Sequence, residues 1–411
     1  MALSVRREIH RRIKDEGRIT FAQFMEMALY WPNGGYYSVS SPTGPRGDFY
    51  TAPGAHPSFG ALLSVQLYQM WLLLDQPRPF WVVEAGAGNG LLCHDSVSFA
   101  RHLPEDFQRS LRYLCLDARN DPGVEANLPD NARSLVQRLA ARSLPMTGVV
   151  GCVISNELLD SFPVHRVEMR GGRLLEVYVT LKGGELEEEL EEPSTGALEE
   201  RLDRLGIKLP EGCCAEVNLA MEPWLQETAQ ILERGYLLTI DYGREATELY
   251  SEARSRGTLT TFYHHTQTDN PYVHVGEQDI TAQVDFTTLM CLGRELGLKS
   301  LGYLTQGRFL INLGIRRLMA RLTTLGLGQQ ERDSNRMGMM ELIRPGGMGE
   351  FKVLVQGKNA PDTSLWGVEA SAELEGLLQD LPVPLLTSLH MPLLQGRYPH
   401  AAVELEGEAG L

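Results

Sequence analysis

The stretch that decides the fold is Phe80-Trp81-Val82-Val83-Glu84-Ala85-Gly86-Ala87-Gly88-Asn89-Gly90, an apolar run followed by glycines that alternate with small residues. The apolar run is long enough for a buried strand. Glycines let the backbone turn sharply and approach a ligand that a Cβ would exclude. Residues 91–102 have the pattern of a helix, whose first N–H groups would face that ligand. We therefore predict the first strand, loop and helix of a nucleotide-type α/β domain.

The spacing of the glycines indicates which ligand the loop binds. A dinucleotide loop has the pattern G-x-G-x-x-G, with its third glycine where helix and strand pack closely. Here glycines stand at 86, 88 and 90, and position 91 is Leu. The pattern E-x-G-x-G-x-G is the form usual in methyltransferases that use S-adenosylmethionine (SAM). We predict that the cofactor is bound by Glu84, Gly86, Gly88 and Gly90. A purely structural strand-to-helix turn is the alternative.

Composition and charge exclude several classes of protein. The formal charge of −15 over 411 residues lacks the basic footprint of a nucleic-acid-binding protein, and it would favour a basic peptide as substrate. The six cysteines show no C-x-x-C pair and no metal-ligand spacing, so we expect buried free thiols and no metal. No window is apolar enough for a membrane span. The N-terminal arginines alternate with acids, unlike a transit peptide, and we expect a cytoplasmic protein.

Alternation of strands and helices predicts a mainly parallel, doubly wound sheet, the Rossmann-like arrangement. Strands are expected at 111–116, 148–155 and 235–240, and a late one at 351–355 at the antiparallel edge or in a hairpin. The strand at 111–116 ends at Asp117, where an acid is expected to bond the hydroxyl pair of a ribose.

The same patterns divide the chain into segments. We expect an N-terminal helical region with a cofactor-side loop (1–75), a methyltransferase domain (76–358) with an inserted sub-domain at about 165–230, and an appendage of unknown role (359–411). Thr20 is a candidate N-cap, and residues 58–74 have the pattern of an amphipathic helix. Within the insertion we expect a hairpin at 164–169 and 174–182, a solvated acidic run at 185–192, and helices at 196–209 and 222–233.

A polar cluster follows the strand at 148–155 directly, at the sheet edge expected to hold the cofactor. It contains Asn156, Glu157 and Asp160, and the two acids would share one side of a helical turn if the segment turns there. Carboxylates can clamp the N–H groups of a guanidinium and accept the proton released on methylation. We therefore predict these three residues to be catalytic and arginine methylation to be the reaction. Ordinary acids at a helix N-terminus are the alternative.

Other polar segments are weaker candidates for the site. Asp48 and Thr51 could reach the cofactor from the N-terminal loop, or could only form turns. Asp241-Tyr242-Gly243 ends another strand at the same edge. The polar loops at 257–265 and 276–286 contain aromatic residues and would suit a substrate lid.

Taken together, these motifs make the chain resemble the MidA family of SAM-dependent methyltransferases. That family includes the mitochondrial complex I assembly factor that methylates an arginine. The matching stretches are Ile19-Thr20-Phe21, Gly35-Tyr36-Tyr37, residues 47–53, residues 84–90, residues 156–160, residues 240–243, residues 257–259, Asp279-Ile280-Thr281 and residues 351–354. The resemblance implies a seven-stranded sheet, SAM at the glycine loop with Asp117 on its ribose, and Asn156 and Glu157 beside the transferred methyl. The chain departs from the family pattern at Gly54, Thr260 and Gln283, on loops expected to face the substrate.

Four functional hypotheses follow. The first is a SAM-dependent protein arginine N-methyltransferase acting on a subunit of respiratory complex I (NADH dehydrogenase). The second is a methyltransferase for a small molecule or another protein side chain, and the third is a SAM-binding assembly factor with little catalysis. The fourth, a nicotinamide oxidoreductase, is disfavoured by Leu91 and by the acid at Glu84.

Overall fold

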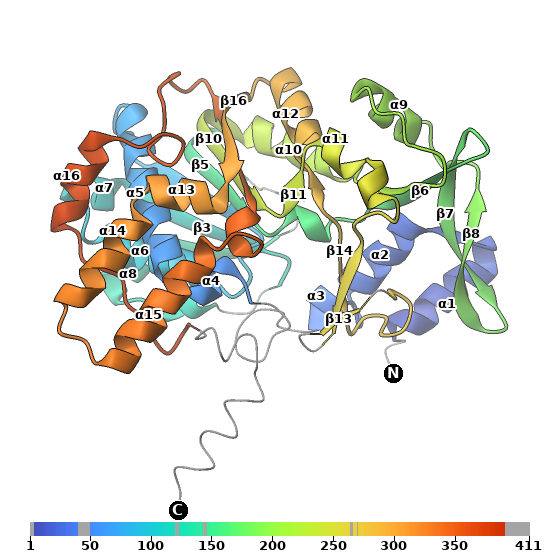
Figure 1. The fold of residues 1–411 in the computed structure, drawn as a ribbon, viewed down its shortest axis with the longest axis horizontal. Helices are drawn as coiled ribbons and strands as arrows, with labels where there is room; N and C mark the ends of the chain where they lie inside the picture. Colours follow the sequence, from blue (N-terminus) through green and yellow to red (C-terminus); the bar gives the residue numbers. More distant parts are fainter. Residues whose placement is uncertain are drawn as a thin grey trace, which may run out of the picture. The chain divides into compact units, whose positions relative to one another are not determined.

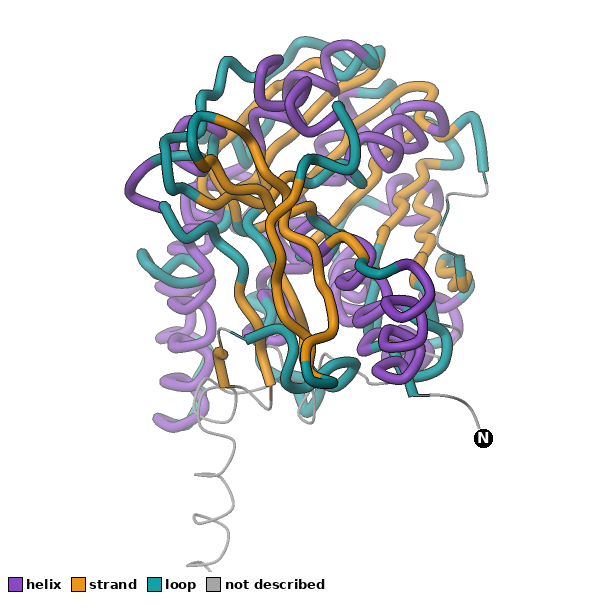
Figure 2. The backbone as a smooth tube through the Cα atoms, turned by 90° about the vertical axis from the view of Figure 1, so that its right-hand side faces the viewer, coloured by secondary structure: helices purple, strands orange, loops and turns teal. Residues whose placement is uncertain are grey.

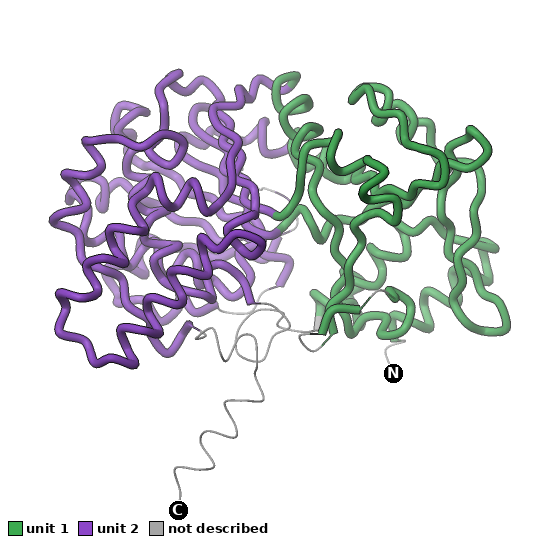
Figure 3. The backbone as a smooth tube through the Cα atoms, viewed as in Figure 1, with its two compact units in different colours: residues 1–40, 158–226, 242–295 green, residues 41–157, 227–241, 296–411 purple. Residues whose placement is uncertain are grey.

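A computed structural model describes residues 4–39, 50–119, 123–141, 143, 146–263, 266–268 and 270–390. Its contacts divide the chain into two compact units (Figure 3). Unit 1 comprises residues 1–40, 158–226 and 242–295, and unit 2 comprises residues 41–157, 227–241 and 296–411. These units do not coincide with the three segments predicted from the sequence. The N-terminal 40 residues group with the insertion, and the described part of 359–411 groups with the glycine loop.

Unit 2 is built on a seven-stranded sheet with the order β16-β17-β10-β5-β2-β3-β4. Neighbouring strands are parallel from β10 to β4, and β17 runs antiparallel to both of its neighbours, β10 and β16. The strands are β2 (Phe80–Ala85), β3 (Leu111–Asp117), β4 (Val136–Ala140), β5 (Val149–Asn156), β10 (Leu232–Asp241), β16 (Lys299–Thr305) and β17 (Lys352–Lys358). The predicted Rossmann-like α/β sheet is therefore confirmed.

Two details of the predicted sheet are wrong. The late strand, β17, is antiparallel as predicted, but it lies between β16 and β10 and not at the edge. The edge strand on that side is β16, whose residues are all partly or fully exposed and do not form the apolar run by which buried strands are recognised. β4 was missed for the same reason, because it closes the opposite edge and carries Gln137 and Arg138.

Helices pack on this sheet and complete the core of unit 2 (Figure 1). They are α4 (Ala52–Ala55), α5 (Ser58–Leu73), α6 (Leu91–Ala100), α7 (Glu105–Ser110), α8 (Asp130–Arg133), α13 (Gln306–Asn312), α14 (Ile315–Arg321), α15 (Gln329–Leu342) and α16 (Ala372–Asp380), with short 3₁₀ turns that include η1 (Val124–Asn127). α5 was expected to be amphipathic, but it is buried on all sides, as a helix inside a core is.

The segment that follows β17 covers part of α5. Gln69 accepts the Trp366 N–H at 2.7 Å, and Gln66 accepts the Gly367 N–H at 2.8 Å. Leu365 and Trp366 are only 1% and 4% exposed and join the core of unit 2. The described part of the predicted appendage is thus an integral part of this unit.

Unit 1 contains a five-stranded sheet of β1 (Ile19–Thr20), β6 (His165–Arg170), β7 (Arg173–Lys182), β8 (Glu185–Glu191) and β9 (Cys214–Val217). Its long strands face the viewer in Figure 2. The predicted hairpin is confirmed as β6 and β7, which pair antiparallel around Gly171-Gly172. The acidic run forms the strand β8, and four of its glutamates are exposed, as expected of a solvated face. Some of its glutamates also pair with arginines, as Glu191 does with Arg18 at 3.0 Å.

The remaining elements of unit 1 are smaller. They are β11 (Gly243–Arg244) paired with β15 (Val284–Asp285), β12 (Thr260–Tyr263) with β13 (Thr266–Thr268) and β14 (Asp279–Thr281), and the helices α1 (Val5–Glu16), α2 (Phe21–Tyr30), α3 (Tyr36–Val39), α9 (Ala197–Arg204), α11 (Ala246–Leu249) and α12 (Phe286–Glu295). α10 (Met221–Ile231) runs from unit 1 into unit 2. Thr20 caps α2 in a complete capping box with Gln23, which confirms the predicted N-cap.

Candidate functional site

The register of the central strands of unit 2 brings two of the predicted motifs together. Ala85 of β2 lies opposite Ser155 of β5 in a parallel pair. The glycine loop that begins at Gly86 and the pair Asn156-Glu157 therefore leave adjacent strands at the same edge. In open α/β sheets this carboxyl edge is where ligands bind.

The glycine loop is bent into a conformation that only glycine adopts easily. Gly86, Gly88 and Gly90 have φ values of 72°, 52° and 76°, in the left-handed region that costs other residues roughly 1–2 kcal/mol each. Gly88 donates its N–H to Asp117 Oδ2 at 2.8 Å, while Asp117 Oδ1 accepts the Arg119 N–H at 2.9 Å. Asp117, the acid predicted to bond a ribose, is thus hydrogen-bonded to the glycine loop. Asp117 Oδ1 also forms an ion pair with Arg119 Nε at 3.5 Å, so Oδ2 is the oxygen with a second lone pair for a hydroxyl group.

Glu84 lies below this loop and is 4% exposed. The Tyr113 hydroxyl donates to Glu84 Oε2 at 2.9 Å. Burial raises the pKa of Glu84 to about 8, although the hydrogen bond from Tyr113 acts in the opposite direction. The side chain is therefore a neutral carboxyl group at pH 7. Direct contact between Glu84 and a cofactor stays a prediction.

Glu157 follows β5 directly and has a φ of 50°, which is unusual for a residue with a Cβ. Its N–H donates to Ile240 O at 2.9 Å, which fixes the bend. Its Oε1 accepts from Asn156 Nδ2 at 3.2 Å and from the Ala52 N–H at 3.4 Å. The contact with Ala52 brings Thr51, the residue before it, close to Glu157. Backbone strain of this kind concentrates at functional sites.

Asn156 offers an acceptor at the same place. Its Oδ1 is buried and makes no hydrogen bond with the residues that the structure describes. A buried acceptor without a partner is costly, so a ligand that donates a hydrogen bond there would remove the cost.

Asp160 belongs to unit 1. It lies in the 3₁₀ turn η2 (Leu159–Ser161), and the prediction that Glu157 and Asp160 share one side of a helical turn is wrong, because the left-handed backbone at Glu157 prevents a helix from starting there. Asp160 is 6% exposed, and its Oδ1 makes no hydrogen bond with described residues. Burial raises the pKa of Asp160 to about 6, partly opposed by hydrogen bonds from Tyr242 and the backbone.

Several of the predicted lid motifs meet one another inside unit 1. Ala282 donates its N–H to Asp160 O at 2.9 Å, and Gln283 donates its N–H to Thr258 Oγ1 at 3.1 Å. Thr258 in turn donates both its N–H and its hydroxyl to Glu216 Oε2, at 2.7 and 3.0 Å. Sequence reasoning did not select Glu216. The available signal was an acid at an inward position of the otherwise apolar strand β9.

Other expectations have simpler outcomes. Asp48 lies outside the described residues. All six cysteines are free, and four of them are buried, namely Cys93, Cys115, Cys152 and Cys213. In the described part of the chain no helix is long and apolar enough to cross a membrane, and no group of three or more His, Cys, Asp or Glu could hold a metal ion.

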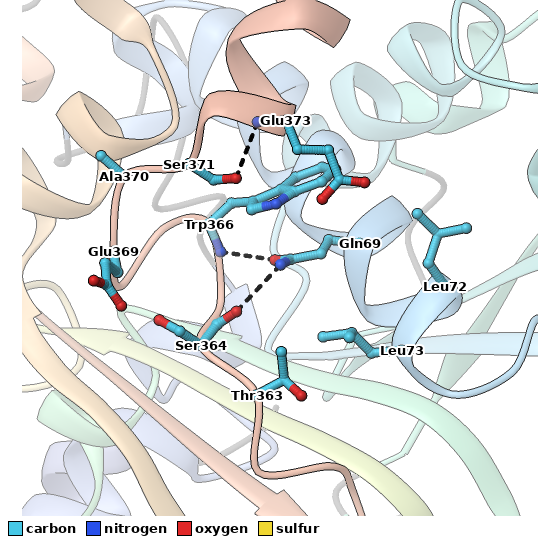
Figure 4. A pocket seen from close by; sticks show the side chains of 10 residues that line it. All are labelled: Gln69, Leu72, Leu73, Thr363, Ser364, Trp366, Glu369, Ala370, Ser371 and Glu373. Carbon is cyan, nitrogen blue, oxygen red and sulfur yellow. Dashed lines mark hydrogen bonds between the residues drawn. The ribbon is translucent and has the colours of Figure 1, made fainter.

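A hollow of about 370 Å³ lies elsewhere in unit 2, between α5 and the segment 363–373 (Figure 4). Gln69 projects into it and bonds the backbone of Ser364 and Trp366. None of the predicted site residues lines this hollow. It results from the packing of the C-terminal segment on α5, and the chemistry described above does not use it.

Comparison with known proteins identifies the family. Residues 62–304 match a family model described as an S-adenosyl-L-methionine-dependent methyltransferase, which covers more than half of the chain. The chain belongs to this methyltransferase family. The MidA-type resemblance and the SAM dependence expected from the sequence are thereby confirmed.

Similar proteins, two known by sequence and one with a solved structure, agree with the assignment to this family. The mitochondrial protein arginine methyltransferase NDUFAF7 of Homo sapiens is 27% identical, over 84% of this chain and 81% of its own, and its Drosophila melanogaster homologue is 26% identical, over 85% and 84%. A protein from Burkholderia thailandensis, solved bound to S-adenosyl-homocysteine, is 28% identical with a TM-score of 0.78, over 88% of this chain and 94% of its own.

Proposed function

We propose that this methyltransferase is a protein arginine N-methyltransferase whose acceptor is a subunit of respiratory complex I. The observation that carries the proposal is the register of β2 and β5, which sets the glycine loop beside Asn156 and Glu157 at one edge of the sheet. One unit would thus supply both a cofactor loop and an acid for the acceptor. The relatives named protein arginine methyltransferases support arginine as the acceptor.

The residues of unit 2 fit SAM. The loop from Gly86 to Gly90 would lie against its amino-acid end, Asp117 would accept from its ribose hydroxyls, and Asn156 Oδ1 would accept a hydrogen bond that no described residue donates. When bound, SAM supplies a methyl group activated by its positively charged sulfur.

Glu157 has the chemistry that an arginine acceptor requires. A guanidinium is planar and permanently charged, so it is a poor nucleophile until a base fixes it and takes a proton. The hydrogen bonds from Asn156 and Ala52 hold the Glu157 carboxylate in one orientation. In this orientation it would accept N–H groups of the guanidinium and receive the proton released on transfer.

Asp160 remains a second candidate acid because of its own surroundings in unit 1. Its buried Oδ1 has acceptor capacity that no described residue uses. A different acceptor, a small molecule or another protein side chain, is the alternative that the substitutions at Gly54, Thr260 and Gln283 favour. We also propose a cytoplasmic location, since free cysteines suit a reducing compartment, whereas the relatives are named mitochondrial proteins.

The test is methyl transfer from labelled SAM to purified complex I, followed by mass mapping of the modified peptides. We expect the label on an arginine. Glu157→Gln should bind SAM as the wild type does, measured by titration calorimetry, but should transfer methyl at least about a hundredfold more slowly, the range expected for loss of a general base. Glu233→Gln, an exposed acid of the same unit, is the matched control.

Each other outcome points to a different function. Label on a different side chain or on a small molecule would replace the acceptor but keep the enzyme class. SAM binding without transfer to any acceptor would indicate an assembly factor. Full activity of Glu157→Gln would refute the role given to its carboxylate.

A further inference from the structure

An ion pair outside the glycine loop helps to hold it in place. Arg138 of β4 donates from Nη2 to Gly88 O at 3.2 Å. The same guanidinium bonds Glu125 of η1 through Nε and, at 3.2 Å, through Nη2. The Arg138 and Glu125 side chains are 12% and 6% exposed, so this is a largely buried ion pair.

Hydrogen bonds from separate strands fix both the N–H and the carbonyl group of Gly88. Asp117 accepts its N–H at 2.8 Å, while Arg138 donates to its carbonyl oxygen at 3.2 Å. The next carbonyl, Asn89 O, accepts the Val124 N–H at 2.7 Å. The centre of the loop is therefore held from β3, β4 and η1, and its conformation does not depend on glycine content alone.

Glu125 also occupies the space that a side chain at position 90 would need. A Cβ added to Gly90 would lie 1.7 Å from Glu125 Oε2, and one added to Gly123 would lie 2.0 Å from the same atom. Glu125 accepts the Gly123 N–H at 3.2 Å. The carboxylate thus fits closely between two glycines and keeps Arg138 neutralised beneath the loop.

We propose that Arg138 is a positioning residue for SAM binding, acting through the Gly88 carbonyl, and that Glu125 holds Arg138 in place. The inference rests on the proposed placement of SAM at the glycine loop. A loop that is already fixed loses little conformational freedom when a ligand binds, whereas a loop released from Arg138 must be ordered at the expense of affinity.

The experiment measures SAM affinity by titration calorimetry and thermal stability on the full chain. Arg138→Met should weaken SAM binding about tenfold, equivalent to about 1.4 kcal/mol. Arg138→Lys keeps the charge opposite Glu125 but has one nitrogen for two partners, so it should fold normally and bind SAM about threefold more weakly. The control is Arg201→Met in unit 1, where Arg201 is 5% exposed and bonds Glu222 at 2.7 Å.

A purely structural role would lower the melting temperature in both methionine variants and leave SAM affinity unchanged in both. We expect instead that only the Arg138 variants lose affinity. Suppose that Arg138→Lys and Arg138→Met both bind SAM with wild-type affinity, while Gly88→Val loses affinity. This result would overturn the inference but leave the proposed SAM site intact. Wild-type affinity in Gly88→Val would overturn both. If Arg138→Met does not fold, the lysine variant decides alone.

Discussion

The buried acid below the glycine loop gives a stability prediction that can be worked out in detail. The change is Glu84→Gln, which removes the titrating group but keeps an oxygen that can accept a hydrogen bond from the Tyr113 hydroxyl. In the wild type this hydroxyl lies 2.9 Å from Glu84 Oε2. Since Glu84 is 4% exposed, solvent screens its environment little. The variant therefore isolates the free energy of ionising this one carboxyl group.

The magnitude follows from the displacement of the pKa. Burial raises the pKa of Glu84 from 4.5 to about 8, so the folded protein binds this proton more tightly than the unfolded chain. Below pH 4.5 both states are protonated and no stability is lost. Between pH 4.5 and about 8 the unfolded chain has lost this proton while the folded protein keeps it. Over that range the free energy of unfolding falls by about 1.4 kcal/mol per pH unit. The accumulated loss is about 3 kcal/mol at pH 7 and about 5 kcal/mol above pH 8, to order of magnitude.

The assay is urea unfolding of the cofactor-free protein at several pH values between 5.5 and 9, followed by tryptophan fluorescence. Glu84→Gln should gain stability over the wild type, and the difference should grow with pH up to about 8 and then level off. Glu233→Gln, which alters an exposed acid in the same unit, should give a curve parallel to the wild type. A difference between Glu84→Gln and the wild type that stays constant over this range would refute a neutral Glu84.

The remaining predictions concern other parts of the molecule. Transfer activity should fall at least about a hundredfold in Glu157→Gln with SAM affinity kept, as measured by labelled-methyl transfer beside calorimetry; equal activity would contradict the role of this acid. Leu365→Ala should destabilise unit 2 by about 2–5 kcal/mol in urea unfolding, because the side chain is 1% exposed in the core; a change below about 0.5 kcal/mol would show that the segment after β17 is dispensable. Thr20→Ala should cost about 1 kcal/mol through loss of the capping box on α2, and Thr20→Ser should restore most of it.

Much of the sheet could be predicted because buried parallel strands leave a strong pattern. β2, β5 and residues 235–240 of β10 are mostly apolar and buried, since helices cover both faces of such a sheet. The edge strands β16 and β4 have no such requirement and were missed. The division into two units could not be predicted from the sequence either. Residues 1–40, 158–226 and 242–295 are distant along the chain, and only their contacts in the folded protein unite them.

The candidate site shows the same division between local and tertiary information. The sequence by itself determined the loop from Gly86 to Gly90 and the polar residues after β5, because strand ends and glycine spacing are local properties. Only the tertiary structure decided that Arg138 and Glu125 support the loop, that burial raises the pKa of Glu84, and that Glu157 takes a left-handed backbone. These features depend on side chains from separate strands and turns that approach within hydrogen-bond distance. No spacing along one chain encodes such an approach.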